Sequence, residues 1–217
     1  VVAFEGRQGY IPGWRNASIS GTGGATYAWP VPLLPFLERR DLYRSFESGT
    51  AAPSSISLLL CASRPAGKTD TAPLAYAGNS GSGTNVKGDG VMLDTTVAKI
   101  GFDFISRGDG TSSTLLMSER CGTTVSVMAN WAAAQASPYV STAIGHPGIV
   151  HVGAPGLARV INAPTTVASG QFRYPSSPHA GGVNVVFCDG HVGFLRNAVS
   201  GNVYSQLLTS NVDVASA

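Results

Sequence analysis

Residues His179–Leu195, HAGGVNVVFCDGHVGFL, carry the strongest local structural signal in the sequence. Val183, Val185 and Phe187 stand at every second position, so they should share one face of a strand, because side chains along a strand alternate between faces. Asp189-Gly190 then supplies a two-residue turn, for which type I′ is predicted because glycine accepts positive φ freely and aspartate better than most residues. Residues 183–195 are therefore predicted to form a β-hairpin.

Ahead of the hairpin, the pattern predicts helices first and strands afterwards. Residues 1–8 look like the end of a helix with Gly9 as its stop signal. Residues 33–47 carry a broad apolar face and predict a helix with Pro35 in its first turn. Strands are expected within residues 56–131, at Ile56–Cys61, Ile100–Ile105, Ser113–Ser118 and Val125–Trp131.

The remaining segments complete a single α+β domain over residues 1–217. Residues 137–178 are rich in Pro and Gly and predict a long ordered loop region with short strands. A short helix is expected at Val203–Leu208. Because no internal repeat or linker divides the chain, we expect one α+β domain.

The composition excludes one class of partner. Charged residues make up only 12% of the 217 residues and the net charge is +2, without the dense basic patch that nucleic acid binding requires. The 27 glycines and 13 prolines suit short strands joined by turns and ordered loops. A surface with so few charges repels itself weakly, which is compatible with close self-packing in an assembly.

Three cysteines are too few for a disulfide scaffold, and their spacing fits no zinc motif. We predict a disulfide between Cys61 and Cys121, because both lie at the ends of predicted strands. Cys188 lies inside a predicted strand and is interpreted as a small core residue.

The segment His179–Gly190 closely resembles the signature of bacterial prepilin-type H-x9-DG proteins. The matching positions are Ser177, His179, Gly181, Gly182, Asn184, Asp189, Gly190, Val192 and Phe194. Further blocks agree in order: Trp29–Tyr43 (WPVPLLPFLERRDLY), Leu60–Ser63 (LCAS, with Ala62 for the usual Pro), Tyr76–Asn79 (YAGN), and Asp109, Gly110, Thr111 and Thr114 followed by Glu119. The resemblance thus covers nearly the whole chain.

The resemblance implies a pilin-like α+β fold, with an amino-terminal helix packed on an antiparallel sheet. It implies a structural subunit that is exported, processed by a prepilin peptidase and assembled at the cell surface into a type IV pilus or a type II secretion pseudopilus. Its partners would be further copies of the chain and the inner-membrane machinery. Membrane contact would come only through an apolar helix of about 20 residues. The sequence opens at Val1 without that helix, so we expect it to have been removed or to lie outside these 217 residues.

Several chemical readings compete with the structural one. A hydrolase triad of His179, Asp189 and a serine is not expected, because about ten extended residues separate the first two by roughly 30 Å.

The resemblance to calcium-binding pseudopilins makes Asp109, Glu119 and Asp189 candidate calcium ligands. Otherwise no cofactor is expected, and zinc binding by His146 and His151 is a weak signal. A surface-anchored module that binds a glycan or a partner through residues 137–178 and Trp131 is the alternative function.

Overall fold

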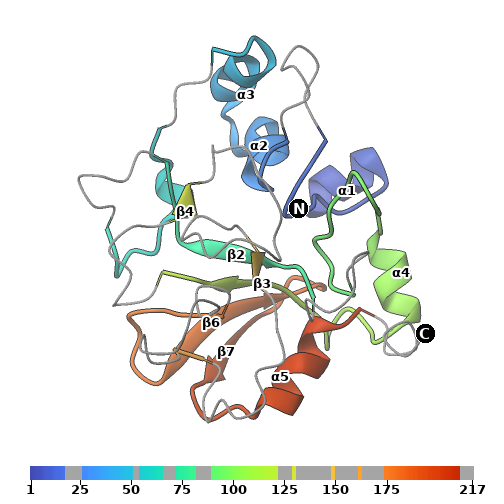
Figure 1. Ribbon diagram of the computed structural model, residues 1–217, viewed down its shortest axis with the longest axis vertical. Helices are drawn as coiled ribbons and strands as arrows, with labels where there is room; N and C mark the ends of the chain where they lie inside the picture. The colour runs from blue at the N-terminus through green and yellow to red at the C-terminus, as the bar shows by residue number, and fades with distance from the viewer. Residues whose placement is uncertain are drawn as a thin grey trace.

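The computed structural model describes residues 1–17, 26–50, 54–65, 72–81, 89–121, 129–130, 148–149, 161–162 and 174–210. Over these residues the fold is α+β, with short helices placed around one main sheet (Figure 1). Most of the expected strand at 125–131 and of the loop region at 137–178 lies outside the described residues, as do Trp131, His146 and His151.

The main sheet has the strand order β5-β2-β3-β6-β7. Four of its strands pair antiparallel in that order, and β5 joins the outer side of β2 as a parallel strand. A separate antiparallel pair joins β1 to β4. The strands are β1 (Pro73–Leu74), β2 (Tyr76–Asn79), β3 (Leu115–Glu119), β4 (Ala129–Asn130), β5 (Gly148–Ile149), β6 (Gly182–Phe187) and β7 (Val192–Arg196).

The hairpin is formed by β6 and β7, but its turn differs from the predicted one. Phe187 N–H donates to the His191 carbonyl and Gly190 N–H donates to the Phe187 carbonyl, both over 3.0 Å, which leaves a three-residue loop, Cys188–Gly190. Gly190 has φ 92°, whereas Asp189 is not among the described non-glycine residues with positive φ. The predicted two-residue type I′ turn is therefore wrong. The longer loop requires only one left-handed residue, and glycine takes that position.

Helices from the first quarter of the chain lie on one side of the main sheet (Figure 1). The helix predicted over residues 33–47 is instead split into three. Pro35 falls inside the second piece, where its missing N–H and its ring prevent a continuous α-helix. Glu38, at φ 59°, then separates that piece from the next. The elements are α1 (Val2–Gln8), α2 (Pro30–Leu33), the 3-10 helix η1 (Leu34–Leu37) and α3 (Arg40–Glu47).

The helix α1 ends at Gly9, as the sequence suggests. Gly9 has φ 75° and its N–H donates to the Glu5 carbonyl over 2.7 Å. Phe4 is the buried residue of α1 and packs edge to face on Tyr10 and Phe36. No described helix has the length and apolar character needed to cross a bilayer.

Two segments predicted as strands are helical. Ile56–Cys61 contains the 3-10 helix η2 (Ser57–Leu59), in which Leu59 is buried while Leu58 is 64% exposed. Ile100–Ile105 contains most of α4 (Phe102–Arg107), whose first turn is capped by Glu5, since Phe102 N–H donates to Glu5 Oε1 over 3.3 Å. Each segment is a short apolar run, whose pattern of apolar residues is compatible with a strand or with a helix. Contacts with the rest of the fold select the helix.

The core lies on both faces of the main sheet. On one face α1, α2, η1 and α3 pack with η2 and with Leu116 of β3. On the other face α5 (Gly201–Leu208) packs through Tyr204 and Leu208 on Val183 and Val185 of β6, as Figure 1 shows at the lower edge of the molecule. The alternating valines of the hairpin therefore hold α5, and the helices of the first quarter cover the opposite face.

Candidate functional site

The side chain of Glu119, at the end of β3, is the centre of the most connected polar site. It is 3% exposed, and His179 Nε2 donates to its Oε1 over 3.0 Å. Its second oxygen, Oε2, accepts the backbone N–H of Asn184 over 2.8 Å. One buried carboxylate thus ties β3 to β6 and to the segment that precedes β6.

The segment ahead of β6 folds back so that His179 can reach Glu119. Ser177 Oγ accepts the His179 N–H over 3.1 Å and donates to the Gly182 carbonyl over 2.8 Å. Gly181 adopts φ 86°, a conformation that favours glycine. His179 and Asp189 are not partners, in agreement with the distance argument from the sequence, and the partner of His179 is Glu119. Nothing in the sequence spacing between these two residues could reveal this contact.

Two cysteine side chains lie beside this pair. Cys61 Sγ is 3.6 Å from His179 Nε2, and Cys61 packs with Cys121 in a small buried cluster. Both are free thiols, so the structure corrects the predicted disulfide: the residues are neighbours, but Cys61 Sγ contacts the histidine and is not bonded to Cys121. Burial, followed by the proximity of Cys61 and Glu119, raises the pKa of Cys121.

The geometry of this cluster is not that of a nucleophile, base and acid relay. In such a relay the nucleophile and the orienting carboxylate contact different nitrogens of the imidazole ring. Here Cys61 and Glu119 both contact Nε2 of His179. The ligand atoms of these three residues all lie within 4.8 Å of one another, so within the described residues they form a group that could hold a metal ion.

The third cysteine is separate from this cluster. Cys188 is buried in the first core beside the hairpin loop, and burial raises its pKa to about 12. It therefore stays protonated at neutral pH and serves as a small core residue, although it lies in the loop and not inside the strand.

The three candidate calcium ligands are not brought together. Glu119 is held by His179 and Asn184. Asp189 Oδ1 accepts from the N–H and from Nδ1 of His191, over 3.0 and 2.6 Å, and these hydrogen bonds lower the pKa of Asp189. Asp109 Oδ2 accepts from Thr209 Oγ1 over 3.1 Å. Within the described residues these three carboxylates therefore do not form one cation-binding group, and each serves a different local contact.

The Asp109–Thr114 turn supports the hairpin loop. Gly110 has φ 87°, and its carbonyl accepts from Thr114 Oγ1 over 2.9 Å. The carbonyls of Thr111 and Thr114 then accept the backbone N–H groups of Asp189 and Cys188, over 3.1 and 2.9 Å. Backbone hydrogen bonds therefore join the Asp109–Thr114 turn to the hairpin loop, although the two lie about 80 positions apart in the sequence.

The side chain of Asn79, at the end of β2, joins three distant segments. Its Nδ2 donates to the carbonyls of Leu115 and Leu208 over 2.7 and 2.8 Å, and its Oδ1 accepts the Gly81 N–H over 2.9 Å. The residue is 0% exposed. Tyr76, at the other end of the strand, donates its hydroxyl to the Leu60 carbonyl over 3.4 Å, and burial raises its pKa.

We expect Asn79→Ala to lower the free energy of unfolding by about 2–3 kcal/mol, because it leaves buried carbonyls and a buried N–H without partners. Asn184→Ala is the matched control, since the side chain of Asn184 is exposed. It should change the free energy by less than about 0.5 kcal/mol. Urea unfolding followed by circular dichroism measures both, and equal effects would contradict the assignment of Asn79 as a buried link.

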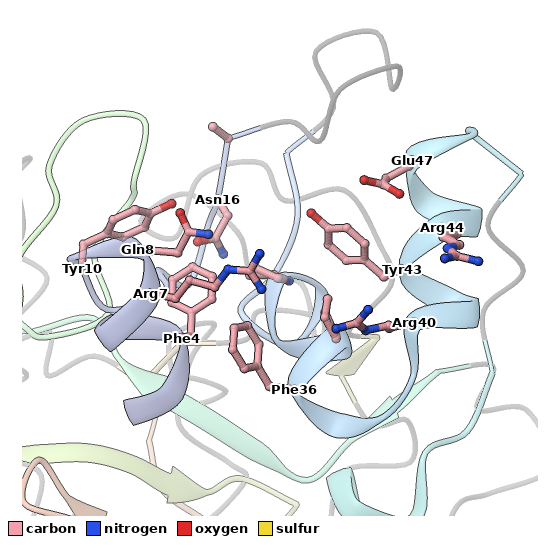
Figure 2. A pocket seen from close by; sticks show the side chains of 13 residues that line it. Phe4, Arg7, Gln8, Tyr10, Asn16, Phe36, Arg40, Tyr43, Arg44 and Glu47 are labelled. Carbon is pink, nitrogen blue, oxygen red and sulfur yellow. The ribbon is translucent and has the colours of Figure 1, made fainter.

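A hollow of about 530 Å³ opens between α1 and α3 (Figure 2). Figure 2 shows Arg7 reaching into it from α1 and Tyr43 pointing toward it from α3. The lining combines aromatic rings with arginines: Phe4, Tyr10, Phe36, Tyr43, Arg7, Arg40 and Arg44. This hollow could not be predicted from the sequence, because its lining comes from α1, η1, α3 and the segment after α1, which only the folded chain brings together.

One comparison with known proteins gives a match. A family model described as "Protein of unknown function (DUF1559)" matches residues 3–201. No curated protein and no solved structure matches the chain.

Proposed function

The chain belongs to the DUF1559 family. From the resemblance of its motifs to those of H-x9-DG prepilins, we propose that it is a non-enzymatic structural subunit of a type IV pilus-like filament or of a type II secretion pseudopilus. In this proposal it is an H-x9-DG prepilin that is exported, processed by a prepilin peptidase and displayed at the cell surface. Its partners are further copies of itself and the inner-membrane machinery that assembles them.

The proposal rests on the contacts that the H-x9-DG residues make in the structure. His179 holds Glu119, and the loop containing Asp189 and Gly190 rests on the Asp109–Thr114 turn. Each contact fixes one part of the sheet to another, and the shared Nε2 contact of Cys61 and Glu119 does not suit a catalytic relay. These roles favour a rigid scaffold over a reactive centre.

The position of α1 also supports the proposal. Phe4 anchors α1 in the core on one face of an antiparallel sheet, the arrangement that the resemblance implies for a pilin. Val2 on the same helix is 65% exposed. In the proposed filament, an apolar helix ahead of Val1 forms the shared core, and the globular domain faces outward. The mechanism is mechanical and interfacial, without turnover chemistry.

Processing by a prepilin peptidase tests the proposal. The complete gene should be expressed in its native host with and without that peptidase. We expect a shortened chain in the sheared surface fraction only when the peptidase is present. A chain of unchanged size and location in both strains would contradict the proposal.

The hollow between α1 and α3 favours a second candidate, a surface-anchored module that binds a glycan or a partner. Aromatic rings provide stacking surfaces for sugars, and Arg7 and Arg40 provide donors for acidic groups. A glycan-array signal that Tyr43→Ala abolishes would favour this candidate if no filaments form. The control is Phe194→Ala on β7, an aromatic residue that is 47% exposed and does not line the hollow.

A further inference from the structure

We propose that Cys61, Glu119 and His179 form a three-ligand binding site for Zn²⁺ or a similar thiophilic divalent ion. The cluster brings together one thiol, one imidazole and one carboxylate from three separate parts of the chain. Cys61 Sγ, Glu119 Oε1 and His179 Nε2 all lie within 4.8 Å of one another. The inference is independent of the filament proposal, because a structural ion would stabilise the domain in any assembly.

The spacing of the three ligand atoms is close to that of a tetrahedral zinc site. Zinc bonds of about 2.3 Å to sulfur and about 2.0–2.1 Å to nitrogen place a tetrahedral S···N pair about 3.6 Å apart and an N···O pair about 3.3 Å apart. In the structure, Cys61 Sγ and His179 Nε2 are 3.6 Å apart. His179 Nε2 and Glu119 Oε1 are 3.0 Å apart. An ion could therefore enter with movements of a few tenths of an ångström.

The three protein ligands leave the fourth position of a tetrahedral ion to water, as in open zinc sites. Binding releases the Cys61 thiol proton, the ring proton of His179 moves to Nδ1, and the lone pairs of Cys61 Sγ and His179 Nε2 then bond to the ion. Cys121 packs with Cys61 in a small buried cluster but does not belong to the ligand group.

The charges of such a site are balanced. One thiolate and one carboxylate bring two negative charges against the two positive charges of the ion. Arg64 lies beside the cluster, with its Nη1 donating to the Cys121 carbonyl over 2.6 Å and its N–H donating to the Cys61 carbonyl over 2.9 Å. The Asn184 N–H also orients Glu119 through Oε2, as an outer contact to a ligand typically does.

The ligands indicate which kind of ion would bind, and the exposure of their side chains indicates the side from which it would enter. A thiolate and an imidazole favour zinc and other thiophilic metals over calcium and magnesium. The side chain of His179 is 29% exposed, whereas Glu119 and Cys61 are only 3–4% exposed. The ion would enter from the side of His179. A disulfide between Cys61 and Cys121 would remove the thiolate ligand, so the bridged form and the metal form exclude each other.

A titration of the 217-residue chain with Co²⁺, thiols kept reduced, tests the proposal. We expect one Co²⁺ per chain, a sulfur-to-cobalt charge-transfer band in the near ultraviolet, and displacement of cobalt by Zn²⁺. Cys61→Ala and His179→Gln should each weaken binding by more than about 100-fold, since loss of even an outer-shell partner costs about 10–100-fold. The matched controls Cys188→Ala and His191→Gln should bind as the unaltered chain does.

Three results would overturn the proposal. One is the absence of the charge-transfer band when all three thiols titrate as reduced. Another is unchanged binding in both Cys61→Ala and His179→Gln. The third is a Cys61–Cys121 bridge that persists under reducing conditions. X-ray absorption of the zinc-loaded unaltered chain needs no variant: one sulfur neighbour supports the site, and a shell of oxygen and nitrogen alone contradicts it.

Discussion

Replacing Glu119 by alanine should lower the free energy of unfolding by about 3 kcal/mol, measured by urea unfolding in the presence of a chelator. The carboxylate is 3% exposed and accepts hydrogen bonds from His179 Nε2 and from the Asn184 N–H. Its removal leaves a backbone N–H in the sheet without its partner and detaches the segment ahead of β6 from β3. The chelator ensures that a bound metal ion contributes nothing to the difference.

An exposed acidic residue provides the control for this substitution. Asp103 pairs with Arg107 over 3.1 Å on α4, and their side chains are 72% and 80% exposed. Such pairs contribute little, so Asp103→Ala should change the free energy of unfolding by less than about 0.5 kcal/mol. If Glu119→Ala were as mild as Asp103→Ala, the buried contact between Glu119 and His179 would not hold the sheet together.

Replacing Gly182 by alanine should be at least as damaging, with an expected loss of about 3 kcal/mol or more. A Cβ on Gly182 would lie 2.1 Å from the backbone oxygen of Leu195, across the hairpin. The clashing atom belongs to the backbone of β7, so no rotation of a side chain can relieve it, and the β6–β7 pairing must open.

The neighbouring glycine serves as the comparison. Gly181 has φ 86°, but a Cβ there would meet no atom within 4 Å. Gly181→Ala should therefore lower the free energy of unfolding by only about 1–2 kcal/mol, the strain of placing an L-residue in the left-handed region. Thermal unfolding of the two variants compares them directly. If Gly181→Ala lowered the free energy of unfolding more than Gly182→Ala does, that result would contradict the close approach of β6 and β7.

The hairpin could be predicted because residues within its own segment of the sequence specify it. Alternating valines specify which face of β6 is buried, and the Asp-Gly pair specifies where the chain turns. The length of the turn was not predictable in the same way. It depends on the carbonyls of Thr111 and Thr114, which hold the loop from a distant part of the chain.

The short apolar runs were mispredicted because their helical form depends on contacts from elsewhere. Ile100–Ile105 alternates as a strand would, yet Glu5 of α1 accepts the N–H of Phe102 and caps the first turn of α4. The polar cluster was hidden for the same reason. Cys61 and His179 are separated by 118 positions, and only the paired strands bring His179 to Glu119.

If the chain is a structural subunit of a surface filament, as we propose, immunogold electron microscopy should locate it there. Antibodies raised against the 217-residue domain should be applied to cells that express the complete gene. We expect gold particles spaced along thin surface filaments, and their loss in a strain without the assembly machinery. Label confined to the cell envelope in both strains, with no filaments, would contradict it.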